Sequence, residues 1–184
     1  MRRVGALLVL ATLVTGCDPL GKASLDPAFG ARVTDGKLQI WTGSRCVGVT
    51  DISVSFEPGR TELKLSSRSE TGVDIEYFTL DGPYPAGLEV SKPLPDGFDW
   101  RAEKSMFLSP HGGTSHWGTS TDLAEVIKGS DQHPRDTYWF QGVGWLNPAD
   151  VAAKDGKTFL AVCTPDPAKN VRRPRRTVGP ATRA

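Results

Sequence analysis

The chain has 184 residues, and its 22 Lys and Arg nearly balance its 21 Asp and Glu, for a formal net charge of +1. This length suits a single folded domain. After a short apolar run near the N-terminus, no stretch approaches the roughly 20 apolar residues that a membrane-spanning helix needs. We therefore expect no permanent membrane span, and we expect no nucleic-acid partner.

The first 17 residues have the layout of a secretory signal. Arg2 and Arg3 are followed by about ten mostly apolar residues and then by the small residues Thr15 and Gly16. The sequence "VTGC", residues 14–17, resembles the lipobox of bacterial lipoproteins. This resemblance implies that residues 1–16 are a lipoprotein signal peptide, that Cys17 is lipidated, and that the protein is lipid-anchored on the extracytoplasmic side of the cell membrane. The alternative is an ordinary signal with a coincidental cysteine.

Composition divides the rest of the chain into three parts. Residues 17–28 are polar and contain Pro, Gly and Ser, which predicts a lipidated tether. Residues 29–164 are expected to fold as the domain. Residues 165–184 combine prolines and basic residues with few apolar ones, which predicts a disordered tail.

Charge separates the body from this tail. Residues 18–164 contain 14 Lys and Arg against 20 Asp and Glu, a net of −6, whereas residues 165–184 contain six against one, a net of +5. The tail holds four clustered arginines: Arg172, Arg173, Arg175 and Arg176. They could contact anionic lipid, a wall polymer or another envelope protein. The tail could equally fold back on the acidic body or remain a solvated end.

Alternating apolar and polar residues predict short strands through the domain. The clearest cases are 37–42, 51–56 and 61–67, and further candidates are 73–80, 105–109, 137–145 and 157–163. Turn-forming Gly, Pro and Asp residues separate them. Six to eight short strands with this spacing predict an all-β fold, an antiparallel, immunoglobulin-like β-sandwich.

Two short helices are expected in connections between strands. In 121–129, Thr121 or Asp122 is the predicted N-cap and Gly129 the C-terminal stop. In 147–156, Asn147 is the predicted N-cap, Pro148 occupies the first helical position and Gly156 follows the end.

Cysteine usage indicates one disulfide. With Cys17 lipidated, Cys46 and Cys163 remain as an even pair in an exported chain. We expect them to join an early strand to the last strand. Neither has a CxxC spacing or a neighbouring histidine, so a catalytic thiol or metal role is disfavoured.

Few residues indicate chemistry. His111 and His116 flank a Gly-Gly turn, and His133 follows with Asp131 and Asp136 nearby, a set that could bind zinc but lacks helical ligand spacing. No nucleophile elbow or phosphate-binding loop is present. We therefore expect no catalytic residues, no metal and no cofactor.

Aromatic residues offer a different kind of site. The chain has five tryptophans: Trp41, Trp100, Trp117, Trp139 and Trp145. Most should fill the core, but exposed ones could stack on sugar rings or on a protein partner. Trp117, next to Gly118, is expected to be the most exposed.

The Ala, Gly, Arg, Asp and Val usage, with the order of anchor, tether and β domain, resembles small envelope lipoproteins of actinomycetes. The expected function is a non-catalytic binding or interaction module at the cell envelope. A structural envelope component is the first alternative. The second is a hydrolase or metal-dependent enzyme that uses His111 and His116.

Overall fold

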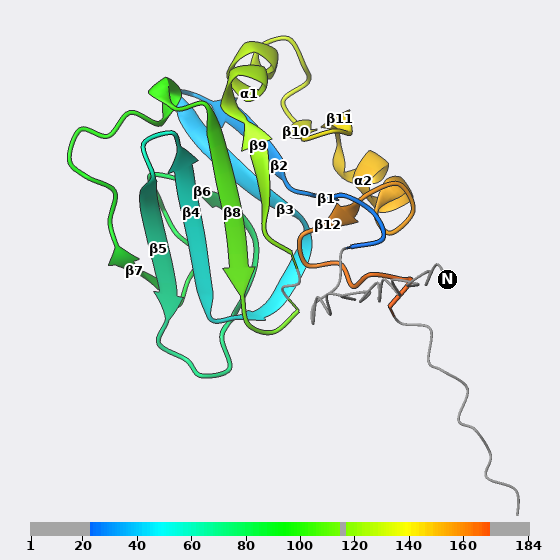
Figure 1. Ribbon diagram of the computed structural model, residues 1–184, viewed down its shortest axis with the longest axis horizontal. Coiled ribbons are helices and arrows are strands. Elements are labelled where there is room, and N and C mark those ends of the chain that lie inside the picture. The colour runs from blue at the N-terminus through cyan, green and yellow to red at the C-terminus, as the bar shows by residue number, and fades with distance from the viewer. Residues whose placement is uncertain (1–22, 115–116, 170–184) are drawn as a thin grey trace, which may run out of the picture.

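Two antiparallel sheets of five strands each pack face to face in the computed structural model, which describes residues 23–114 and 117–169 (Figure 1). The β3 sheet has the order β11 (Gly144–Leu146), β10 (Tyr138–Phe140), β2 (Gly30–Thr34), β3 (Lys37–Val49) and β6 (Val73–Thr79). The β4 sheet has the order β7 (Leu88–Lys92), β5 (Thr61–Ser67), β4 (Asp51–Glu57), β8 (Ser105–His111) and β9 (Thr119–Asp122). The predicted antiparallel β-sandwich is confirmed.

The core between the sheets follows the alternation in the sequence. Alternate residues of the three clearest predicted strands are buried: Leu38, Ile40, Thr42, Ile52, Val54, Phe56, Leu63 and Leu65. Trp100, in the 3-10 helix Trp100–Ala102, closes part of this core. Because successive strand residues point to opposite faces, the polar residues between them face outward.

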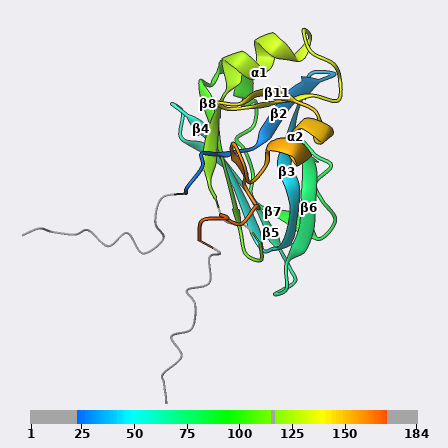
Figure 2. The same ribbon diagram turned by 90° about the vertical axis from the view of Figure 1, so that its right-hand side faces the viewer.

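The middle of β3 is buried on both of its faces. Trp41 points away from the main core into a second cluster that includes Phe140, Val151 and Phe159. This cluster lies between the outer face of the β3 sheet and a cover made of α2 (Pro148–Lys154) and β12 (Leu160–Ala161), as Figure 2 shows from the side. β12 pairs in parallel with β1 (Pro27–Ala28). The cover leaves part of the outer face of the β3 sheet uncovered.

Both predicted helices are present as connections, with one correction. α2 has Asn147 as its N-cap, in a capping box with Asp150, and Pro148 at its first position. α1 (Leu123–Ser130) has Asp122 as its N-cap, with its carboxylate accepting from the backbone N–H groups of Ala124 and Glu125. The expected stop at Gly129 was wrong, because α1 continues through it.

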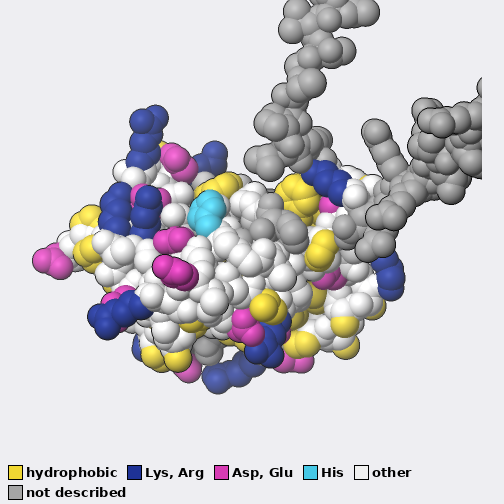
Figure 3. All heavy atoms as spheres, turned by 90° about the horizontal axis from the view of Figure 1, so that it is seen from below, with side chains coloured by type: hydrophobic (Ala, Val, Ile, Leu, Met, Phe, Trp, Pro, Cys, Tyr) yellow, Lys and Arg dark blue, Asp and Glu magenta, His cyan; other side chains and the backbone are white. Residues whose placement is uncertain are grey.

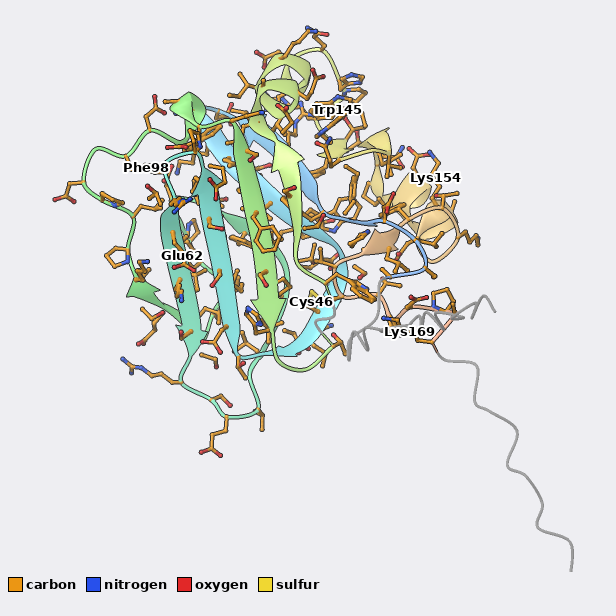
Figure 4. All side chains as sticks on the ribbon, viewed as in Figure 1. Cys46, Glu62, Phe98, Trp145, Lys154 and Lys169 are labelled. Carbon is orange, nitrogen blue, oxygen red and sulfur yellow. A yellow bond between two sulfur atoms is a disulfide. The ribbon has the colours of Figure 1, made fainter. Side chains whose placement is uncertain are left out.

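Gly129 has a packing role instead. A Cβ atom on this residue would lie 2.4 Å from the indole of Trp145, far closer than van der Waals contact allows. Figure 4 shows Trp145 beside α1. The missing side chain therefore lets the indole pack against the helix.

Cys46 and Cys163 form the predicted disulfide, with their Cα atoms 5.2 Å apart. Cys46 lies in β3, as expected of an early strand. Cys163 does not end a long last strand: only Leu160–Ala161 of the predicted 157–163 strand is extended, and the cysteine lies in the turn after it. The disulfide therefore fastens the outer cover to the β3 sheet.

The folded part of the chain extends beyond 29–164 at both ends. Pro27–Ala28 forms β1, and Ser24 donates through its backbone N–H and its hydroxyl to the carboxylate of Asp166, at 2.8 and 2.5 Å. These hydrogen bonds hold the pKa of Asp166 below its usual value. Part of the expected tether and the start of the expected tail are therefore packed together. Within the described residues, no helix has the length and apolar character needed to cross a bilayer.

Candidate binding site

An aromatic group occupies the uncovered part of the outer face of the β3 sheet. In the β3–β6 ladder, Trp41 is directly opposite Tyr77, and Gln39 is directly opposite Thr79. These two cross-strand pairs are neighbours on the same face of the sheet. The Trp41 and Tyr77 rings are stacked, with centroids 5.4 Å apart and planes at 9°. Tyr138, from β10, lies 6.0 Å from Tyr77 at 51°.

A cleft of about 270 Å³ opens at this place, and we call it the aromatic cleft. Its lining residues are Gln39, Ile40, Tyr77, Phe78, Thr79, Pro83 and Tyr138. Tyr77 is 45% exposed, whereas Trp41 beneath it is 2% exposed. The volume of the aromatic cleft lies just below the usual range for ligand pockets, about 300–1,000 Å³. A cleft of this size suits a group the size of one ring.

Hydrogen bonds hold the aromatic side chains in place. The indole N–H of Trp41 donates to Oε1 of Glu76 at 3.3 Å. Oε1 of Gln39 accepts from the hydroxyl of Thr34 at 3.1 Å and from that of Tyr138 at 3.4 Å. Within residues 23–114 and 117–169, Nε2 of Gln39 has no hydrogen-bond partner. This amide nitrogen can therefore donate to a bound molecule.

The tyrosines of the cleft remain uncharged across the physiological pH range. Burial, and secondarily the nearby Glu76 carboxylate, raise the pKa of Tyr77 to about 12. Burial also raises the pKa of Tyr138, although Arg32 opposes this shift. Both phenols are therefore neutral and can donate or accept hydrogen bonds.

Arg32 positions the loop that leads into β10 and therefore positions Tyr138. Its side chain is buried on the outer face of the β3 sheet. The guanidinium donates to four backbone carbonyl oxygens at 2.6–3.1 Å, those of Ser130, His133, Pro134 and Thr137. Arg32 thus has a structural role, because the hydrogen bonds of its guanidinium all go to backbone carbonyls.

A second hollow, of about 340 Å³, lies at the junction of β1 and β9. Polar side chains dominate its lining: Asp26, Thr119, Ser120, Gln141 and Thr158. It offers no stacked rings. The aromatic cleft therefore has the more specific arrangement of side chains.

Trp117 is not fully exposed, and the structure does not distinguish it from Trp139 and Trp145, which are also half-buried. It is half-buried, its backbone N–H donates to the Val162 carbonyl at 3.1 Å, and its indole N–H donates to the Thr164 carbonyl at 3.2 Å. The ammonium group of Lys169, labelled in Figure 4, lies 4.7 Å from the centre of the indole ring. Trp117 therefore packs against the C-terminal segment.

The histidines are placed separately. His111 is exposed at the end of β8, with Nε2 3.2 Å from the Ser109 hydroxyl. His133 stacks on Trp145, with centroids 4.6 Å apart and planes at 15°. In the described part of the chain, no carboxylate forms an ion pair with His111. There is also no group of three or more His, Cys, Asp and Glu side chains placed to hold a metal ion among these residues.

Several predicted residues lie outside the described ranges: Cys17, His116, Arg172, Arg173, Arg175 and Arg176. Over the face drawn in Figure 3, Lys and Arg side chains are interspersed with Asp and Glu side chains, and neither sign forms a large continuous patch.

Comparisons with known proteins identified no relative: no protein-family model, no curated protein and no solved structure matches this chain.

Proposed function

We propose that this protein is a membrane-anchored extracytoplasmic lipoprotein that acts as a non-catalytic binding module at the cell envelope. The observation that carries the binding role is the aromatic cleft. It combines an exposed Tyr77, held by a buried Trp41, with an amide donor on Gln39. A purely structural component does not need such a site. The Ser109–His111 contact lies at the end of β8, and His111 has no ion pair with a carboxylate among the described residues.

The junction of the two chain ends supports the anchoring part of this proposal. Ser24 and Asp166 are hydrogen-bonded, so the segment that carries Cys17 and the segment that carries the arginines join the domain at one place (Figures 1 and 2). A lipid at Cys17 and basic residues in the tail would then both act at the same membrane surface. Two such signals together give stable attachment.

The anchor is tested by detergent phase partitioning of the wild type and of Cys17→Ser. The wild type should enter the detergent phase, and the variant should enter the aqueous phase or be released from cells. Equal partitioning of both proteins into detergent would contradict lipidation at Cys17.

Binding is tested by sedimentation with isolated cell envelopes, using the full chain with Cys17→Ser so that the lipid does not contribute. Tyr77→Ala should reduce the sedimenting fraction. Phe107→Ala is the matched control, because Phe107 is 39% exposed on the opposite sheet and should not affect it. Equal sedimentation of all three proteins, or none by any, would refute a binding role for the cleft.

A further inference from the structure

We infer that the ligand of the aromatic cleft is a neutral saccharide, with the C–H face of one pyranose ring stacked on Tyr77. This inference rests on the proposed function and names its ligand class. Four features of the cleft support it: the single accessible ring, the spacing of the rings, the free polar atoms and the absence of positive charge from the lining.

Tyr77 offers one rigid aromatic platform. Its stack against Trp41 fixes the ring on the sheet, and Trp41 is itself fixed by its hydrogen bond to Glu76. A platform that is already ordered loses little conformational entropy when a ligand binds. The C–H groups of a sugar face carry partial positive charge, which suits the negative face of an aromatic ring.

The ring spacing determines where the sugar lies. A flat group between two rings needs about 3.5–4 Å on each side, so the ring centres would have to be at least about 7 Å apart. The Tyr77 and Tyr138 centroids are 6.0 Å apart. The ligand therefore lies on the exposed part of Tyr77 and does not insert between the tyrosines.

Polar atoms beside the ring match the hydroxyl groups of a sugar. Nε2 of Gln39 is a donor without a partner in the described residues, and Thr79 contributes a half-buried hydroxyl on the opposite strand. The Tyr138 hydroxyl, which donates to Oε1 of Gln39, can accept a hydrogen bond from a sugar hydroxyl. Donors and acceptors at the edge of a stacking platform allow sugar hydroxyls to be bound and the ring to be oriented.

The charge of the cleft favours a neutral sugar over an anionic one. Its lining contains neither Lys nor Arg. The guanidinium of Arg32, whose charge acts on Tyr138, is buried and bound to carbonyls. Glu76 places a carboxylate next to Trp41 and Tyr77. Uronic acids and phosphorylated polymers would be repelled.

A proline-rich peptide is the other ligand that stacks on tyrosine and tryptophan. Such peptides form extended helices that lie across aromatic-lined grooves. Here Trp41 is 2% exposed and cannot serve as a second accessible ridge. The cleft, at about 270 Å³, also suits one ring better than an extended chain.

The test is calorimetric titration of the full chain with Cys17→Ser against neutral trisaccharides of glucose, galactose, mannose and N-acetylglucosamine. A galacturonic acid trisaccharide is the anionic counterpart of the galactose probe. At least one neutral probe should bind, and the galacturonic acid trisaccharide should bind more weakly than its galactose counterpart.

Variants locate this binding. Tyr77→Ala should weaken it by about tenfold, which is the size of one lost aromatic contact, while Tyr77→Phe should keep most of it. Gln39→Leu keeps the Trp41–Tyr77 stack but removes the amide donor and the acceptor for the Tyr138 hydroxyl, so it should also weaken binding even if Tyr77→Ala fails to fold. Phe107→Ala, on the other sheet, should bind the sugar as tightly as the protein that carries Cys17→Ser alone.

Each contrary result has a distinct meaning. If no neutral trisaccharide binds but decaproline binds in a Tyr77-dependent way, the saccharide inference is wrong and the proposed binding module stands. Neutral sugar binding that is unaffected by both Tyr77→Ala and Gln39→Leu would place the ligand elsewhere and overturn the inference. If envelopes also fail to retain the protein through the cleft, the proposed function fails with it.

Discussion

Loss of the Cys46–Cys163 disulfide should destabilise the domain by about 4–5 kcal/mol. The bridge closes a loop with a sequence separation of 117 residues. In the chain-entropy model, a loop of this length restricts the unfolded chain by about 5 kcal/mol at 25 °C. Since small domains have unfolding free energies of about 5–15 kcal/mol, the bridge supplies a large share of the total.

The measurement is urea unfolding followed by tryptophan fluorescence, in a Cys17→Ser background that removes the third thiol. Three samples are compared: the oxidised protein, the same protein kept reduced, and Cys46→Ala/Cys163→Ala. The reduced protein and the double variant should both lose several kcal/mol of unfolding free energy. A loss below about 1 kcal/mol in both would refute the reasoning, because the cover would then be held to the β3 sheet without the bridge.

Three further predictions concern single residues. Gly129→Ala should destabilise the domain by about 1–2 kcal/mol in chemical unfolding, because the added Cβ would displace Trp145. Alanine ordinarily favours a helix over glycine, so a stabilised variant would contradict this packing. Arg32→Lys should lose about 2–4 kcal/mol in the same assay, since one ammonium group cannot replace a guanidinium that serves four carbonyls; an unchanged midpoint would refute this. Tyr77 should ionise near pH 12 by ultraviolet difference absorbance against Tyr77→Phe, and its contribution to stability, complete below the ordinary tyrosine pKa of about 10, should be lost as pH rises from about 10 to 12; ionisation of Tyr77 near pH 10 would show that neither desolvation nor Glu76 raises its pKa.

Local patterns predicted much of the sandwich, but they missed β2, β7 and β9, and the single strand expected over 137–145 is the β10–β11 hairpin. Alternation in residues 37–42, 51–56 and 61–67 identified the strands and their inward faces, because each strand has one face in the core. Capping residues such as Asn147 identified the start of a helix for the same local reason. The error at Gly129 arose because glycine is both a frequent helix terminator and the residue that permits close packing. Only the position of Trp145 distinguishes these two roles.

The aromatic cleft could not be located from local patterns. Alternation predicts that Trp41 and Ile40 point to opposite faces of the sheet, with Trp41 on the face expected to be exposed. It does not show that α2 and β12 cover the Trp41 side chain. Nor does it pair β3 with β6 in the register that stacks Trp41 on Tyr77. Trp117 was expected to be exposed because its neighbouring glycine suggested a solvated turn, whereas contacts with the distant segment around Thr164 leave it half-buried.

The most direct test of the binding role is nuclear magnetic resonance mapping with the ¹⁵N-labelled full chain carrying Cys17→Ser. Soluble fragments of isolated cell envelope are added, and backbone amide shifts are followed residue by residue. We predict that the largest changes occur at Gln39, Tyr77, Thr79 and Tyr138, with little change in the β4 sheet. Unchanged amides at the aromatic cleft, whether or not another surface responds, would contradict a binding module that acts through this site.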